Sequence, residues 1–227
     1  MRRLLRGLGA ILTALLVVGC GPRSQPFPVQ SPEEIEQLTA VTDGVVALIG
    51  SSKRDEALPQ ALAALSAARE IYRLHADAIR SRTNTDVLTC IRTHSIGILD
   101  LETLLARRDE AARQQDEDTV KRRNADLWML ASDMGGCAAM SMEFLINAEK
   151  RPAALQHGAI LISEIYSTAV IIRAALGLKV EPLLADQIRA YERVLATLGP
   201  EQKAPFINDA LPKLKAALAQ TKSSAPE

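Results

Sequence analysis

The segment from residue 153 to residue 176 constrains the fold of this chain more than any other feature, because it is apolar on nearly every side of a helix. A helix of this kind lies at the centre of a folded domain or crosses a membrane. Glu164 lies near its midpoint, and a charged side chain at that depth of a bilayer costs about 2.5 to 3.5 kcal/mol or more. Arg173 adds a second charge, and Gly177 follows as a C-cap. We therefore expect residues 153–176 to form the central helix of a helical domain.

Apolar residues recur three or four positions apart in several other segments, which is the period of an amphipathic helix. Aromatic residues make up only 3% of the chain, and β-branched residues seldom alternate with polar ones, so the composition favours helices over strands. Ser31 and Glu34 have the spacing of a capping box around Pro32, which predicts a helix start at that proline and a helix end near Gly50. Further helices are expected over residues 59–82, 86–113, 119–150 and 181–198, and a stretch broken by Pro205 and Pro212 offers a last one.

These segments predict an all-α fold, an irregular bundle of about six to seven helices. The tetratricopeptide pattern does not recur at a period of 34 residues, and a degenerate helical repeat is the alternative. The helical domain is expected to span residues 32–222, with a disordered tail at residues 223–227. A domain of this length can bury a sizeable core.

The N-terminus has the layout of an export signal. Arg2, Arg3 and Arg6 precede an apolar run over residues 8–18. The run is about half the ~20 residues that a membrane-spanning helix needs, so we expect it to be removed instead of remaining as a permanent span.

The run ends at Val17, Val18, Gly19 and Cys20, which resembles the lipobox of bacterial lipoproteins. The resemblance implies that a diacylglyceryl group is attached to the Cys20 thiol, that residues 1–19 are cleaved as a signal peptide, and that the new amine is acylated, commonly by palmitate. Residue 21 is Gly21 and not aspartate. In bacteria with two membranes this favours the outer membrane, with the protein facing the periplasm. The alternative is an ordinary secretory leader or a short anchor.

Residues 20–31 follow as a lipidated cysteine and a flexible tether that contains Pro22, Pro26 and Pro28. At about 3.1 Å per residue in a polyproline-like conformation, this tether reaches roughly 34 Å, so the domain stays close to the lipid bilayer. The leader holds three of the 27 basic residues and none of the 27 acidic residues, so the mature chain has a formal net charge of −3. This charge does not suit a nucleic-acid partner.

Cys90 and Cys137 are expected to form a disulfide, because the compartment outside the cytoplasm is normally oxidising. If residues 86–113 and 119–150 form an antiparallel hairpin that turns near residue 114 or 115, Cys137 lies within one turn of the position level with Cys90. A bridge closing this loop of about 48 residues would stabilise the fold by roughly 4 kcal/mol.

A metal site and free buried thiols are the alternatives to the disulfide. His94 lies four residues after Cys90 on the same helical face, and Met134 and Met140 lie one turn on either side of Cys137. Thiolate, thioether and imidazole together would suit copper. Methionines at this spacing are more often core residues, and the spacing matches no recognised metal motif.

Motifs for catalysis, covalent haem, di-iron binding and phosphate binding are missing from the sequence, so neither an enzyme nor a cofactor is expected. His75 and His157 are expected to be surface or interface groups, and Trp128 is expected to lie at the edge of the core. The dense mixed charges over residues 107–123 indicate a solvated turn with local ion pairs, with a docking surface as the alternative.

The leading functional hypothesis is a non-catalytic lipoprotein of the cell envelope, whose helical domain binds an envelope protein as a scaffold, assembly factor or accessory subunit. The alternative is a binding module for a metal ion or a hydrophobic small molecule inside the bundle. An enzyme acting on the cell wall is the third and least favoured reading.

Overall fold

The structure is a computed structural model, and it describes residues 30–51, 53–80, 101–199 and 204–223. This part of the chain folds into helices without any strand, as expected for an all-α bundle of about six to seven helices. The helices are α1 (Pro32–Gly50), α2 (Arg54–Arg80), α4 (Leu101–Arg113), α5 (Glu117–Ala148), α6 (Pro152–Ala175), α7 (Glu181–Leu198) and α8 (Pro205–Ser223).

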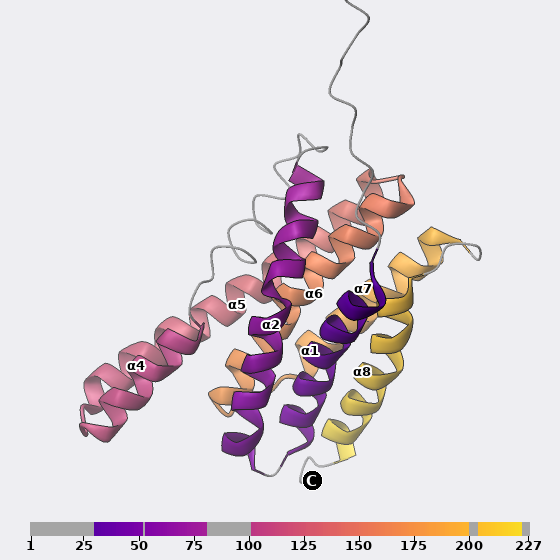
Figure 1. The fold of residues 1–227 in the computed structure, drawn as a ribbon. Coiled ribbons are helices and arrows are strands. Elements are labelled where there is room, and N and C mark those ends of the chain that lie inside the picture. Colours follow the sequence, from indigo (N-terminus) through magenta and orange to yellow (C-terminus); the bar gives the residue numbers. More distant parts are fainter. Residues whose placement is uncertain (1–29, 52, 81–100, 200–203, 224–227) are drawn as a thin grey trace, which may run out of the picture.

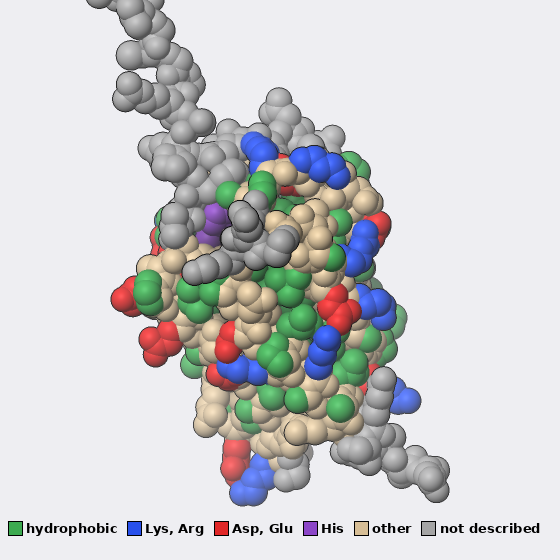
Figure 2. Space-filling model, turned by 90° about the vertical axis from the view of Figure 1, so that its right-hand side faces the viewer, with side chains coloured by type: hydrophobic (Ala, Val, Ile, Leu, Met, Phe, Trp, Pro, Cys, Tyr) green, Lys and Arg blue, Asp and Glu red, His purple; other side chains and the backbone are tan. Residues whose placement is uncertain are grey.

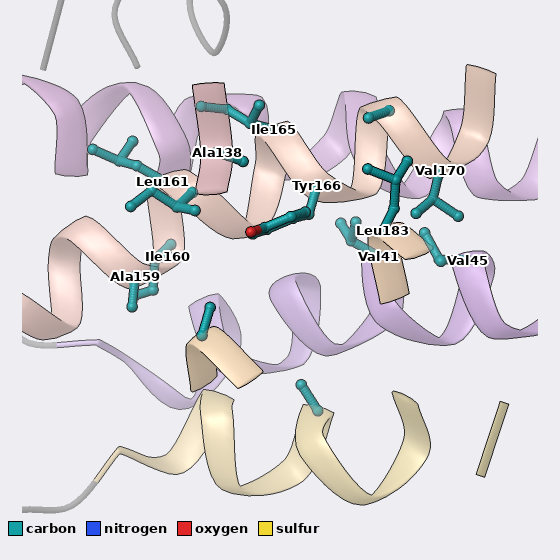
Figure 3. Close-up of a cluster of buried hydrophobic side chains, with 14 of the residues drawn as sticks. Val41, Val45, Ala138, Ala159, Ile160, Leu161, Ile165, Tyr166, Val170 and Leu183 are labelled. Atoms are coloured by element: carbon teal, nitrogen blue, oxygen red, sulfur yellow. The ribbon is translucent and has the colours of Figure 1, made fainter. Parts of the chain in front are cut away.

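The most apolar helix, α6, lies at the centre of the bundle, as the sequence predicts. It packs against α1, α2, α5 and α7. Its length and hydropathy would allow it to cross a membrane, but 89% of the apolar window is buried inside the fold. Figure 3 shows part of this core, where Ile165, Tyr166 and Val170 of α6 lie among side chains of the neighbouring helices.

The other helices surround α6, and ion pairs connect some of them. Helix α1 packs against α2 and α8, and α7 packs against α5 and α8. Lys213 of α8 lies 2.8 Å from Asp43 of α1, and Lys215 of α8 lies 2.6 Å from Glu192 of α7. Helix α4 packs on α5, and Figure 1 shows α4 and the first part of α5 projecting from one side of the bundle as an arm, while the rest of α5 packs against α6.

Local hydrogen bonds define several helix ends. The capping box at Ser31 forms as predicted, because its hydroxyl accepts from the Glu34 backbone and its own N–H donates to the Glu34 carboxylate at 3.0 Å. Gly177, at φ 69°, ends α6 as expected, with the Leu178 N–H bonded to the Arg173 carbonyl at 2.8 Å in a Schellman motif.

The turn between α4 and α5 uses the same motif without glycine. Gln115 adopts φ 59°, and the Asp116 N–H bonds to the Ala111 carbonyl at 2.9 Å. The Asp116 carboxylate then caps α5 by accepting from the Thr119 N–H at 3.0 Å. The two helices are therefore joined by a short turn, which supports the predicted turn near residue 114 or 115.

Three predicted boundaries were wrong. Helix α2 begins at Arg54 and contains Pro59, α5 begins at Glu117, and α8 runs through Pro212. Pro59 is the sixth residue of α2 and Pro212 the eighth residue of α8, so both lie beyond the first turn and each removes one i→i−4 hydrogen bond from its helix. In α8 the side chains around the proline are buried in the core, and this packing overrides the local penalty. Of the helix expected over residues 86–113, residues 101–113 form α4, and residues 86–100 lie outside the described residues.

Two glycines allow close contact between α5 and its neighbours. A Cβ atom on Gly135 would lie 2.6 Å from Cδ2 of Leu183 in α7, and one on Gly158 of α6 would lie 2.2 Å from Cδ2 of Leu145. Glycine at these positions therefore removes a steric clash between packed helices.

Candidate functional site

Several residues of the predicted lipid, disulfide and copper sites lie outside the described residues. These are Cys20, Cys90 and His94. Cys137 and Met134 are both buried in the core. The lipidation of Cys20, the Cys90–Cys137 disulfide and the alternative copper site therefore stay predictions. The described residues contain no group of three or more His, Cys, Asp or Glu side chains able to hold a metal ion.

A buried histidine pair lies between α2 and α6. His75 of α2 and His157 of α6 are both almost inaccessible to solvent, and their Nδ1 atoms are in direct contact. Their ring centroids lie 4.4 Å apart, with 28° between the ring planes. Since the two Nδ1 atoms are in contact while the ring centroids lie 4.4 Å apart, the nitrogens lie between the two centroids. The rings therefore meet edge to edge through these atoms and do not lie face to face. Of the two positions expected for these histidines, a surface or an interface, the structure shows the second, between α2 and α6.

The environment keeps His75 neutral. Burial, together with the proximity of His157, lowers the pKa of His75 from 6.5 to about 3. In the neutral pair one imidazole donates its Nδ1–H and the other accepts. The described residues provide no hydrogen-bond partner for Nε2 of His75.

A second group of buried polar side chains lies across α2, α6 and α7, within the same core. Ser163 of α6 lies beside the phenol groups of Tyr72 and Tyr191, and Nε2 of Gln187 donates to the Tyr191 hydroxyl at 3.4 Å. Burial raises the pKa of Tyr191 to about 12, and burial also raises the pKa of Tyr72 well above its usual value. Both phenols therefore remain protonated and act only as neutral hydrogen-bonding groups.

Glu164 of α6 belongs to this buried group. Its burial raises the pKa of the carboxyl group well above the usual range, and the positive charge of Arg69 on α2 lowers it in part. One carboxyl oxygen has no hydrogen-bond partner among the described residues.

The sequence contained one sign of these buried groups. His75 lies three residues after Tyr72 and four before Ile79, which places it on the apolar stripe of its helix. Its contact with His157, 82 residues away, depends on how α2 and α6 pack, and no local pattern reports that packing.

A different feature lies on the outside of α5, where four large apolar side chains are exposed. Trp128 is 51% exposed, Met129 50%, Met140 69% and Phe144 50%. Trp128 is half exposed, which is compatible with the expected position at the edge of the core. An exposed tryptophan, phenylalanine and two methionines on one helix form an unusual surface, because these types are normally buried.

Three of these residues lie on one row of the helix surface. Trp128, Ser132, Gly136, Met140 and Phe144 follow one another at intervals of four, and we call this row the α5 ridge. Rows at this spacing are the ones that most often interlock when two helices pack. The side chains of the α5 ridge are large at both ends and small at Ser132 and Gly136. The row therefore has a depression at these two residues, which we call the saddle.

The adjacent glycines of α5 face opposite environments. Gly135 is buried against Leu183, whereas a Cβ atom on Gly136 would meet no heavy atom within 4 Å. Glycine inside a helix costs about 1 kcal/mol relative to alanine. Packing within the described residues accounts for Gly135 and not for Gly136.

The charged turn between α4 and α5 contains mostly local ion pairs, as the sequence predicts. Arg113 lies 2.5 Å from Glu110, and Arg123 lies 3.2 Å from Asp126. Another face of the molecule, shown in Figure 2, likewise has interspersed charges of both signs among its hydrophobic side chains. Pairs this exposed contribute at most about 1 kcal/mol each.

Comparison of the chain with known protein families, with characterised proteins and with solved structures gave no match.

Proposed function

We propose that this chain is a lipid-anchored protein of the bacterial cell envelope that works by binding a protein through the α5 ridge. In this proposal the Cys20 thiol bears the lipid, the tether over residues 20–31 holds the domain near the periplasmic face of the outer membrane, and the helical domain supplies no catalytic group. The exposure of large apolar side chains along α5 is the observation that carries the proposal.

Exposed apolar area of this kind is unfavourable unless something covers it, at roughly 25 cal/mol per Å² of apolar surface in water. Tryptophan is among the residues that contribute most to binding energy at protein interfaces, and methionine adapts its shape to different partners. The α5 ridge contains both types beside a phenylalanine and carries no charge of its own. These properties suit the apolar face of a helix as the bound element.

The buried groups support a structural role better than a chemical one. Both histidines and Glu164 lie inside the core, where they contact neighbouring helices and are shielded from solvent. They define how α2 packs on α6, and so help to hold the core from which α5 extends. The function proposed here accordingly places the binding surface on the outside of the bundle.

A photo-crosslinking experiment tests this function. A photoreactive amino acid replaces Met140 in the full-length protein, and intact cells are irradiated. We expect a crosslinked protein adduct at Met140. The matched control places the same group at Gln37, an exposed residue of α1, and should give little adduct. Equal adduct yields at Met140 and Gln37 would contradict a protein-binding role for α5. So would the absence of any adduct both at Met140 and at Phe144, when the photoreactive amino acid is placed at each in turn.

A further inference from the structure

We infer that the protein bound by the α5 ridge is a second copy of this chain, with the two α5 helices crossing antiparallel at Gly136. This inference rests on the proposed function, since it requires the ridge to be a protein-binding surface. It goes further by naming the partner and the point of contact.

The first argument is the symmetry of the ridge. Trp128 and Phe144 are both aromatic and lie eight residues before and after Gly136, while Ser132 and Met140 lie four residues to either side. In a two-fold symmetric dimer, residue i contacts residue j and residue j contacts residue i. An antiparallel crossing at Gly136 therefore brings Trp128 of each copy close to Phe144 of the partner subunit, and the same aromatic contact forms twice.

The second argument is the shape of the ridge. When the i±4 rows of two helices pack, the helix axes cross at about −50° and approach most closely at one point. Small side chains at that point let the backbones approach. Among the described residues, no heavy atom lies within 4 Å of a Cβ atom built on Gly136, so its lack of a side chain serves no contact with that part of the chain. In the crossed pair it lies at the closest approach, with the small residue Ser132 beside it.

The third argument concerns charge. The charged neighbours of the ridge are Asp133 and Glu143, which lie three residues before and seven residues after Gly136. In the antiparallel arrangement the position opposite Asp133 is Ala139 of the partner subunit, and the position opposite Glu143 is Met129 of the partner subunit. Neither carboxylate faces its own copy, so the two-fold contact does not create the like-charge repulsion that would oppose self-association.

Membrane attachment would favour the same partner. If Cys20 is lipidated, all copies are confined to one membrane surface. The high effective concentration there increases the fraction of copies that form a weak contact with each other.

The test uses the full-length protein in intact cells, with a photoreactive phenylalanine derivative at Trp128. We expect an adduct of twice the chain mass that contains only this polypeptide, and mass spectrometry should locate the attachment near Phe144. Gly136→Leu should lower its yield by about tenfold, because a large side chain fills the saddle. Ala125→Leu, also on α5 but off the ridge, should leave the yield unchanged, and circular dichroism should show equal helicity in both variants.

The outcomes separate the two proposals. An adduct between Trp128 and a different protein overturns self-association and leaves the proposed function standing. A dimer whose yield is the same in wild type and Gly136→Leu overturns the crossing point. The absence of any adduct from both Trp128 and Met140 overturns the inference and the proposed function together.

Discussion

Mild acid should destabilise this protein through His75. The imidazole is completely buried against His157, and this environment lowers its pKa from 6.5 to about 3. Above pH 6.5 the side chain is neutral in both the folded and the unfolded protein, so its titration does not affect stability. Below that pH the unfolded chain binds a proton that the folded protein excludes, and the free energy of unfolding falls as the pH falls toward about 3.

The size of the effect follows from the two pKa values of His75. Each pH unit between them costs about 1.4 kcal/mol, so the loss reaches about 2 kcal/mol near pH 5 and about 5 kcal/mol below pH 3. Glu164 acts in the opposite direction, since its raised pKa means that the folded protein keeps a proton that the unfolded chain releases above the usual carboxyl pKa. The pH dependence of the wild type alone therefore mixes the two groups.

A comparison with His75→Gln separates the histidine pair from Glu164, because Glu164 is present in both proteins. Urea unfolding of the chain without leader or lipid gives the free energy of unfolding at about pH 7.5 and about pH 5. Between these conditions the wild type should lose about 2 kcal/mol more than His75→Gln. Equal losses in the two proteins would show that His75 is accessible to protons in the folded state and would refute the buried-pair argument.

Three further predictions concern the anchor, the disulfide and the central helix. Cys20→Ala should abolish palmitate labelling and membrane fractionation, and unchanged labelling would show that the lipobox resemblance misleads. Cys90→Ser or Cys137→Ser should lower the free energy of unfolding by about 4 kcal/mol at most. If both thiols can be alkylated under non-reducing conditions, the disulfide does not exist. If bound copper is also found and is lost in His94→Ala, the site is a metal site. Ile162→Asp should reduce the unfolding midpoint severely, because Ile162 is fully buried in α6 and the change buries an unpaired charge; a wild-type chain without leader or lipid that needs detergent to stay in solution would instead assign α6 to the membrane.

Features set by neighbouring residues could be predicted from the sequence. The capping box at Ser31 and the C-cap at Gly177 each depend on a few adjacent residues, and both form as expected. The uniform apolar character of α6 likewise determines its central place, because a helix without a polar face must be covered by other helices on every side. The all-α class follows from the same local periodicity.

Features set by packing between distant segments could not be predicted in this way. Pro212 was expected to break the last helix, but α8 continues because the core holds its buried face. The place of His75, at a surface or at an interface, was left open for the same reason: the helical period shows which residues share a face, but not which face a neighbour covers. Helix α5 is covered on the side of Leu127 and left open on the side of Met140.

The adjacent glycines of α5 show how this difference between covered and open faces can be measured. Gly135→Ala places a methyl group 2.6 Å from Cδ2 of Leu183, a buried side chain that must rotate within the packed core to admit it, so overpacking of about 1 to 3 kcal/mol should exceed the helix gain of about 1 kcal/mol. The methyl group of Gly136→Ala meets no atom of the described residues within 4 Å, so this change should raise the free energy of unfolding by about 0.5 to 1 kcal/mol. The two changes are chemically identical and one residue apart, so urea unfolding of dilute protein compares the two faces directly. If both variants changed the free energy of unfolding with the same sign, α5 would not have Gly135 facing α7 and Gly136 facing solvent. The open position at Gly136, on which the proposed self-association depends, would then be contradicted as well.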